Sequence, residues 1–469
     1  MKTPRKTKIL VTLGPATESP DQIRKLIDAG ANIFRLNMSH ASHDWCRQIV
    51  ETIREASEQS GTSVATLIDL QGPSIRTGDV DGKLEINVGC VVEFRNNDLE
   101  PGETLSVTTN YNGLSEDVNV GDVMLVDNGE IHFKVTRQEP GRLICQALTE
   151  GSMGSRRHIN LPGVRVNLPA LTKKDLLDIK LAAELDVDFV AISFVRDAEH
   201  VRYLREQLAE EDCSAKIVSK IEDQEAVRNL SSIINETDAV MVARGDLGIE
   251  VHIEELPVVQ RTILKECARI GRKVIVATHM LESMIENPVP TRAEITDVAN
   301  AVFEQADAVM LSGETSVGQY PIKCVEVLDR IARRIEQEPG MGFCDALELR
   351  SEKQHSVRSA VGLANSLQES KLIIFTARGV LANYTAHQRP VSAPIFAFSP
   401  SEKVVRALNL NRSVVPFKAD FADNPEATIR QAIEFLKDQQ YIEEGDPCVI
   451  LSDVLNQDFD TEAILLRKA

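Results

Sequence analysis

The segment KIVSKIEDQEAVRNLSSIINETDAVMVARGD, residues 216–246, decides the fold of this chain. It opens with a short apolar run rich in β-branched residues, passes through a stretch of helical length and ends in a second apolar run that begins at residue 239. Apolar runs that alternate with helix-length stretches are typical of βα units around a parallel sheet. Charged residues close both runs, so one edge of the expected sheet collects polar groups.

The same alternation extends over most of the chain. Between the first two runs, for example, SPDQIRKLIDAG (19–30) predicts a helix capped by Ser19 or Asp21 and ended by Gly30. A (β/α)₈ barrel closes with eight strands, and the sequence supplies eight runs. The runs are KILVTL (8–13), NIFRLNMS (32–39), SVATLIDL (63–70), DFVAISFV (188–195), KIVSKI (216–221), AVMVARGD (239–246), KVIVATH (273–279) and AVMLSGE (308–314).

Two parts of the chain depart from this pattern. The third and fourth runs are separated by an interval rich in Gly, Val, Thr and Asn, with turn signals such as EPGE and DNGE, which predicts an inserted all-β domain. After a linker, a further αβ pattern begins near Ser356. We expect residues 1–72 and 170–343 to form the barrel, residues 73–169 a β-barrel lid over its site, and residues 344–469 a C-terminal α/β domain for regulation or assembly.

Composition excludes several classes of protein. A formal net charge of −19 argues against affinity for nucleic acid or a membrane surface, because both are anionic. No apolar stretch approaches the roughly 18 residues of a membrane span, and the N-terminal MKTPRKTKIL lacks the features of a signal peptide. The cysteines are scattered without metal-ligand spacing, as expected for reduced thiols. We therefore expect a cytoplasmic protein.

Polar residues collect at the carboxyl ends of the expected strands, which is where barrels of this kind carry their active sites. Cations, carboxylates and hydroxyls recur around this one rim, and an arbitrary arrangement would not produce such regularity. The rim residues are Thr12, Arg35, Asn37, Ser39, Asp69, Ser193, Arg196, Lys220, Glu222, Arg244, Asp246, Thr278, Ser312, Glu314 and Thr315.

Two of these carboxylates, Glu222 and Asp246, predict a divalent-metal site. Mg²⁺ takes one or two protein carboxylates and leaves positions for substrate oxygens and water. Strand alternation places Lys220 on the same side as Glu222, where an ammonium can neutralise a phosphoryl group in transfer. Structural interpretations stay open as well: an ion pair of Lys220 with Glu222, or a helix cap at Asp246. A structural pair of Arg35 with Asp69 is a third.

With these motifs in view, the chain resembles the pyruvate kinase family. The likeness covers roughly Lys8 to Glu336 and continues more weakly to the C-terminus. It rests on segments in the family's order: FRLNMSH, DLQGPSIRTG, INLPG, SKIED, VARGDLG, VIVATHMLESM, PTRAE and LSGETSVGQYP. The resemblance implies a homotetrameric barrel enzyme that transfers phosphoryl between phosphoenolpyruvate and ADP with Mg²⁺ or Mn²⁺.

The resemblance also assigns roles to single residues. Arg35 would hold the transferring phosphate, and Lys220 would be the catalytic cation. Thr278, with the backbone groups of Gly245 and Asp246, would hold the carboxylate of the substrate, and Thr278 would lie near the path of the proton to the enolate carbon.

The remaining assignments concern the metal and the nucleotide. Glu222 and Asp246 would bind the divalent metal. Arg76 and Arg157 match positions that meet nucleotide phosphates, although the family usually has Lys at the latter, and Arg keeps the charge with a different donor geometry.

One departure from the family concerns K⁺. The family's monovalent-cation site would use Asn37, Ser39, Asp69 and the position of Leu70. Leu70 and Gln71 resemble the branch that works without K⁺. Ser74, however, matches neither the Lys of that branch nor the Glu of the K⁺ users, so K⁺ dependence is left open.

Two further departures concern regulation. His279 stands where the family usually has Gln, and a neutral imidazole can replace that side chain as a hydrogen-bond group. In TARGVLAN (376–383) only Thr376 and Arg378 remain of a Ser/Thr-rich phosphate loop, and the final ILSDVLNQDFDTEAILL (450–466) lacks the usual Gly-rich closing loop. Activation by a sugar bisphosphate is therefore not expected.

Two competing hypotheses stay open, one of them another enzyme and the other a protein of a different class. Another Mg²⁺-dependent barrel enzyme acting on phosphoenolpyruvate or pyruvate, such as an aldolase or mutase, would share the acidic metal site but lack the inserted domain and the motif set. A non-catalytic paralogue that binds metabolites would explain the substitutions at Leu70, Ser74 and His279, yet Lys220 and Glu222 are retained.

Overall fold

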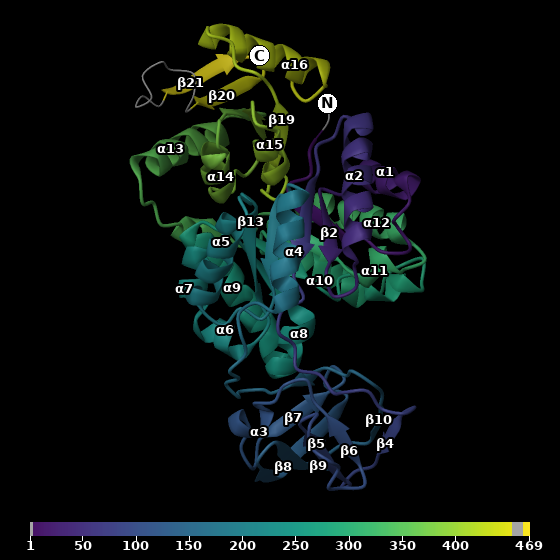
Figure 1. Ribbon diagram of the computed structural model, residues 1–469. Coiled ribbons are helices and arrows are strands. Elements are labelled where there is room, and N and C mark those ends of the chain that lie inside the picture. The colour runs from purple at the N-terminus through teal and green to yellow at the C-terminus, as the bar shows by residue number, and fades with distance from the viewer. Residues whose placement is uncertain (1–2, 453–462) are drawn as a thin grey trace.

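Three parts of the chain are stacked along one axis, with the barrel in the middle (Figure 1). The computed structural model describes residues 3–452 and 463–469. The inserted β-rich part lies at one end of the barrel and the C-terminal part at the opposite end. No helix among the described residues is long and apolar enough to cross a membrane.

The barrel is closed by eight parallel strands in the order β1-β16-β15-β14-β13-β12-β3-β2. Each corresponds to one of the eight apolar runs, so the predicted (β/α)₈ barrel is confirmed. The strands are β1 Lys8–Thr12, β2 Ile33–Asn37, β3 Ala65–Asp69, β12 Phe189–Ile192, β13 Lys216–Ile221, β14 Ala239–Ala243, β15 Lys273–Ala277 and β16 Ala308–Leu311.

The helices around the barrel begin where the sequence provides capping side chains. The Ser19 hydroxyl accepts from the Gln22 N–H at the start of α1, as predicted, and capping boxes start α4 and α10. The α-helices are α1 Pro20–Asp28, α2 His43–Ser60, α4 Lys173–Glu184, α5 Ala198–Glu210, α6 Gln224–Arg228, α7 Leu230–Glu236, α8 Arg244–Glu250, α9 Leu256–Ile270, α10 Arg292–Phe303, α11 Gly313–Ser316 and α12 Pro321–Ile335. Short 3₁₀ turns are η1 Ile253–Glu255 and η2 Glu282–Ile285.

Alternate residues of the barrel strands point into its interior, where they form one apolar cluster. Ile33, Leu67 and Val218 belong to this cluster and are fully buried. In each case the residue two positions further along the same strand is charged: Arg35, Asp69 and Lys220. Because side chains two apart share a face of a strand, the interior is apolar in its middle and charged at its carboxyl rim.

The inserted domain lies in the third βα connection, between β3 and α4, and has its own apolar core. Its strands form a six-stranded sheet, β11-β7-β8-β9-β5-β6, and a two-stranded sheet, β10-β4. In the six-stranded sheet β11 and β6 are the two end strands, so its strand pairing is open, whereas a β-barrel was expected. The elements are β4 Leu84–Ile86, β5 Val91–Arg95, β6 Ser106–Thr108, α3 Leu114–Asp117, β7 Val123–Val126, β8 Ile131–Glu139, β9 Arg142–Ala147, β10 Gly151–Met153 and β11 Ile159–Asn160.

The C-terminal domain is an α/β sheet of order β19-β18-β17-β20-β21. Its alternating helices and parallel strands agree with the αβ pattern expected from the sequence, whereas the antiparallel edge strand β21 was not expected, and α13 begins at Glu352, before the expected start near Ser356. The elements are η3 Phe343–Ala346, α13 Glu352–Ser366, β17 Lys371–Phe375, α14 Val380–His387, β18 Ile395–Ser399, α15 Glu402–Leu408, β19 Val414–Lys418, α16 Pro425–Asp438, β20 Pro447–Ser452 and β21 Ala463–Lys468. Most of the closing segment singled out in the sequence, 453–462, lies outside the described residues.

The C-terminal domain closes the base of the barrel. Leu410, in the loop after α15, packs into the interior cluster of the barrel and is fully buried. Beside it, the Arg389 guanidinium donates to both carboxylate oxygens of Asp307 at 2.6 Å, and Arg406 donates to Asp188 at 2.8 Å. The base is thus filled by apolar side chains and ion pairs, which leaves the opposite rim of the barrel as the end that is not covered by the C-terminal domain.

Replacing Leu410 by Ala should lower the free energy of unfolding by about 2–5 kcal/mol, because a buried side chain is removed and a cavity stays between two domains. The measurement is urea denaturation of the full chain. Leu177→Ala on the exposed face of α4 is the matched control and should change stability by less than about 0.5 kcal/mol. Equal effects of the two variants would contradict the proposed packing of Leu410 in the barrel.

Candidate functional site

A cavity of 360 Å³ lies between the carboxyl rim of the barrel and the inserted domain. It is lined by residues from both, so the site has a barrel wall and an insert wall. The predicted site residues that line it are Arg35, Asn37, Ser39, Leu70, Arg76, Arg157, Lys220, Glu222 and Asp246.

Asp69, the last residue of β3, lies at the centre of the charges on the barrel wall. Its carboxylate accepts from the Arg35 Nε at 2.7 Å and lies 3.3 Å from the Lys220 Nζ. Burial raises the pKa of Asp69, but the charges of Lys220 and Arg35 outweigh burial and hold this pKa below its usual value. Both cations are therefore fixed by one ionised carboxylate, and the structural pair of Arg35 with Asp69 is present. In the described part of the chain the Arg35 Nη2 has no partner and is left to bind a ligand.

Lys220 is held from a second side by Glu222. The Nζ atom lies 2.8 Å from the Glu222 Oε1 and donates to the Ser193 hydroxyl at 2.7 Å. Burial alone would lower the pKa of Lys220, but Asp69 and Glu222 raise it above its ordinary value. The ammonium is thus permanently charged and pointed at the rim, and the ion pair considered from the sequence is realised.

Glu222 and Asp246 have the donor set of a divalent-metal site. Burial and the negative charge of Asp246, opposed by the positive charge of Lys220, together raise the pKa of Glu222 to about 7. Its Oε2 accepts from the Phe194 N–H at 2.5 Å, and its buried Oε1 has only the Lys220 ammonium beside it, with no well-aligned hydrogen bond from the described residues. A buried carboxylate with acceptor positions left over fits a cation. Asp246 is not a helix cap, because it lies in the first turn of α8, after the cap position at Ala243.

No cluster of three or more His, Cys, Asp or Glu residues that could hold a metal occurs in the described chain. A pair of carboxylates is the arrangement that Mg²⁺ uses when substrate oxygens and water complete its coordination.

Thr278 and Gly245 meet where β15 and β14 end. The Gly245 N–H donates to the Thr278 hydroxyl at 2.8 Å, and this hydroxyl donates to the Ala277 carbonyl at 2.7 Å. Thr278 is in the left-handed region with φ 66°, which is unusual for a β-branched residue. Its hydroxyl is thereby turned toward the first turn of α8, where Asp246 lies.

The insert wall contributes arginines. Arg157 lies 3.2 Å from Asp127 through its Nη1, and its buried Nε has no partner among the described residues. Arg76 donates to the Ser74 hydroxyl at 3.2 Å and to the Arg156 carbonyl at 3.1 Å. Arg76 and Arg157 line the same cavity as Arg35 and Lys220, so cations from both walls are available to an anion there.

Comparison with known families decides which barrel this is. The family model described as "Pyruvate kinase, barrel domain" matches residues 4–325, and that described as "Pyruvate kinase, alpha/beta domain" matches residues 355–464. The chain belongs to the pyruvate kinase family. Members of this family are phosphotransferases acting on phosphoenolpyruvate and ADP in glycolysis, so the alternative of an aldolase or mutase is wrong.

Individual pyruvate kinases are similar over nearly the whole chain. The chain is 38% identical to a pyruvate kinase of Dictyostelium discoideum over 96% of its own length and 91% of that protein. It is 39% identical to a pyruvate kinase of Sporosarcina psychrophila over 96% of its length and 78% of that protein. A solved pyruvate kinase from Cryptosporidium parvum superposes with a TM-score of 0.93 at 32% identity, covering 98% of this chain and 96% of that one.

A second cavity of 550 Å³ was not predicted from the sequence. It adjoins the first, since Asn37 and His40 line both, and extends past Gly14 and Pro15 to Trp45. The Trp45 indole N–H donates to Glu18 at 2.9 Å. A single tryptophan just after a rim segment is the signal that could have drawn attention to it.

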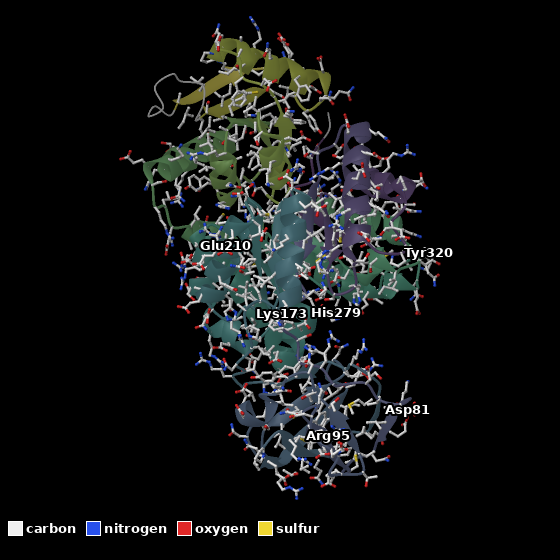
Figure 2. All side chains as sticks on the ribbon, in the orientation of Figure 1. Asp81, Arg95, Lys173, Glu210, His279 and Tyr320 are labelled. Atoms are coloured by element: carbon white, nitrogen blue, oxygen red, sulfur yellow. The ribbon has the colours of Figure 1, made fainter. Side chains whose placement is uncertain are left out.

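The departures from the family pattern lie in different places. Asn37, Ser39 and Leu70 line the rim cavity, and the Leu70 carbonyl accepts from the Ser193 hydroxyl at 2.7 Å. His279 is exposed near the junction of barrel and insert, 3.3 Å from Glu282 (Figure 2). Thr376 and Arg378 follow β17 in the C-terminal domain, at the other end of the molecule from the rim.

Proposed function

We propose that this chain transfers the phosphoryl group of phosphoenolpyruvate to ADP at the rim cavity, giving pyruvate and ATP. The observation that carries the proposal is the Lys220 ammonium, held between Asp69 and Glu222 beside the guanidinium of Arg35. Phosphoryl transfer needs in-line positioning and neutralisation of charge more than covalent help from the protein. Two fixed cations at one rim supply the neutralisation.

Arg35 and Lys220 bind the phosphoryl group and follow it through transfer. Asp69 keeps both side chains in place before the substrate arrives, so no reorganisation is needed when charge shifts to the transferring oxygens. The Arg35 Nη2 and the Lys220 ammonium are the donors that reach the phosphate oxygens.

Glu222 and Asp246 hold Mg²⁺ or Mn²⁺ in this proposal. When bound, the ion neutralises phosphate and enolate oxygens as a Lewis acid. Both carboxylates line the cavity beside Lys220, which is the support for this assignment. Burial raises the pKa of Glu222 to about 7 even beside Lys220, and a second positive charge at this carboxylate would offset that effect of burial.

The pyruvate end of the substrate lies toward Thr278. The backbone N–H groups of Gly245 and Asp246 and the Thr278 hydroxyl bind its carboxylate. After transfer the enolate carbon gains one proton, and a water held by the Thr278 hydroxyl delivers it. The 2.8 Å contact between Gly245 and Thr278 supports a single site for these groups.

ADP approaches from the insert side. Arg76 and Arg157 bind its phosphates, and closure of the insert as a lid brings Arg157 onto them. The nucleoside enters the second cavity beside Trp45, since that cavity shares Asn37 with the first. An aromatic ring and an apolar wall suit a purine base.

No strict requirement for K⁺ is proposed. Asp69 is already balanced by Arg35 and Lys220, and the Leu70 carbonyl already accepts a hydrogen bond. Ser74 adds no negative charge that a second cation would have to neutralise. Asn37 and Ser39 would bind K⁺ together with Asp69 and Leu70 only if an added negative charge changed the balance between Asp69, Arg35 and Lys220.

Assembly and location complete the proposal. The family resemblance supports a homotetramer in the cytoplasm, with the C-terminal domain serving regulation or assembly and phosphoenolpyruvate and ADP as its small-molecule partners. The net charge of −19 supports the expectation that neither nucleic acid nor a membrane is a partner.

Lys220→Met should leave the metal site formed but lower kcat by roughly 10³-fold or more, because a cation aligned with the transition state is lost. The measurement is pyruvate release coupled to ATP formation under saturating Mg²⁺ and K⁺. Retained turnover in Lys220→Met would remove Lys220 from the mechanism. A wild-type chain that binds phosphoenolpyruvate without turnover would instead support the non-catalytic paralogue.

Glu222→Gln should raise the Mg²⁺ concentration for half-maximal rate by about 10-fold or more, because a ligand charge is lost. Arg157→Ala is the matched comparison and should chiefly raise the KM for ADP while leaving the Mg²⁺ requirement within about twofold. Initial rates across Mg²⁺ and ADP concentrations separate the two. The assignment fails if both variants change the same parameter.

Replacing K⁺ by a large organic cation should lower the initial rate by less than about threefold, because the site charges are already balanced. Ser74→Glu is the matched variant: the added carboxylate should make the rate depend on K⁺. Strong K⁺ activation of the unmodified chain would overturn the charge argument.

A further inference from the structure

The chain is strained where β15 ends. Thr278 and His279 are two successive non-glycine residues with φ 66° and 54°. Each such residue costs on the order of 1–3 kcal/mol and persists only when its surroundings hold it there. The turn carries the hydroxyl proposed to act on the enolate, so whatever holds the turn also fixes the geometry of that hydroxyl.

Arg244 is the side chain that holds this turn. It is the first residue of α8, 7% exposed, and its guanidinium lies under the strained segment. Its Nε donates to the Ala277 carbonyl at 3.1 Å, and its Nη2 donates to the Thr278 carbonyl. The same Nη2 lies 2.9 Å from the sulfur of Met280. One planar group thus contacts three of the four residues 277–280.

The other edge of the guanidinium is anchored on two helices. Its Nη1 lies 2.8 Å from the Asp297 carboxylate on α10 and 3.4 Å from the Gln260 Oε1 on α9. Gln260 in turn donates to Glu304 at 2.9 Å. Because both edges of the group are fixed, Arg244 cannot follow the turn if the turn relaxes, and it therefore resists such relaxation.

The Ala277 carbonyl joins Arg244 to the hydroxyl of Thr278. This oxygen accepts from the Arg244 Nε and also from the Thr278 hydroxyl at 2.7 Å. The hydroxyl meanwhile accepts from the N–H of Gly245, the residue next to Arg244 in the chain. The side chain of Arg244 and the backbone that follows it thus locate the hydroxyl together.

We propose that Arg244 is a positioning residue for the protonation step: it keeps Thr278 left-handed so that its hydroxyl stays aimed at the substrate. The inference rests on the proposed role of Thr278. A lysine cannot replace it, because an ammonium lacks the planar fork that reaches two carbonyls and a carboxylate at once. Arg244 itself touches no reacting atom.

Enolisation of pyruvate is the reverse of the protonation step, so exchange of its methyl hydrogens with D₂O reads out this step alone. We would measure it by ¹H NMR in the full chain with Mg²⁺ and ATP. Arg244→Lys should slow the exchange by about 10–100-fold, with the KM for ADP changed less than about twofold. In a Thr278→Val background the same replacement should slow exchange by less than about threefold, since the hydroxyl it positions is gone.

Arg5→Lys is the matched control. Arg5 is 8% exposed at the opposite end of the barrel and likewise bridges two carbonyls, those of Thr7 and Gly30, and a carboxylate, that of Asp329. The Arg5→Lys chain should lose about as much thermal stability as the Arg244→Lys chain, but its exchange of methyl hydrogens should not slow. Should Arg244→Lys fail to fold, Asp297→Asn removes the charge that holds the same guanidinium on α10 and should slow exchange about threefold to tenfold.

Three results would overturn the proposal about Arg244. The first is that Arg244→Lys slows exchange equally in the wild-type and Thr278→Val backgrounds, and the second is that it slows exchange no more than Arg5→Lys does. The third is an Asp297→Asn chain with an unchanged exchange rate. A Thr278→Val chain that exchanges normally would instead refute the role of Thr278, independently of what Arg244 does.

Discussion

The site depends on one buried ammonium. Lys220 is held at the top of the barrel interior by Asp69 and Glu222, with Arg35 on the far side of Asp69. A charge taken out of water is costly unless it is paired, and here each buried group has a partner of opposite sign. The charges that a migrating phosphoryl group needs are therefore in place before substrate binds, and the pairing that permits their burial also fixes their directions.

The rest of the molecule keeps this rim available. At the base, Leu410 and the pair of Asp307 with Arg389 close the barrel, so its interior is packed and rigid. At the rim, the inserted domain forms the second wall of the cavity and contributes cations. At the end of β15, Thr278 is left-handed and its carbonyl accepts from Arg244 of α8. The packed base of the barrel thus supports the strands whose carboxyl ends carry the proposed site residues.

Much of the fold and of the rim could be predicted from the sequence, because strand alternation has a local cause. Residues two apart in a strand share a face, as do Leu67 with Asp69 and Val218 with Lys220. A buried apolar run that ends in a charged residue therefore predicts a charged rim.

Contacts between distant segments could not be predicted in this way. The pairing of Arg244 with α9 and α10, the cavity at Trp45 and the edge strand β21 each depend on side chains or strands brought together only by the complete fold. The interpretation of Asp246 as a helix cap was wrong, because α8 begins two residues before it.

The most direct test of the account is the location of the metal. Crystals grown with Mn²⁺ and a non-reactive analogue of phosphoenolpyruvate would give an anomalous peak at the ion. We expect the peak roughly 2.1–2.2 Å from a carboxylate oxygen of both Glu222 and Asp246, with the phosphate group of the analogue on Arg35 and Lys220. A peak held by other residues, with Lys220 turned away from the phosphate, would contradict the central claim.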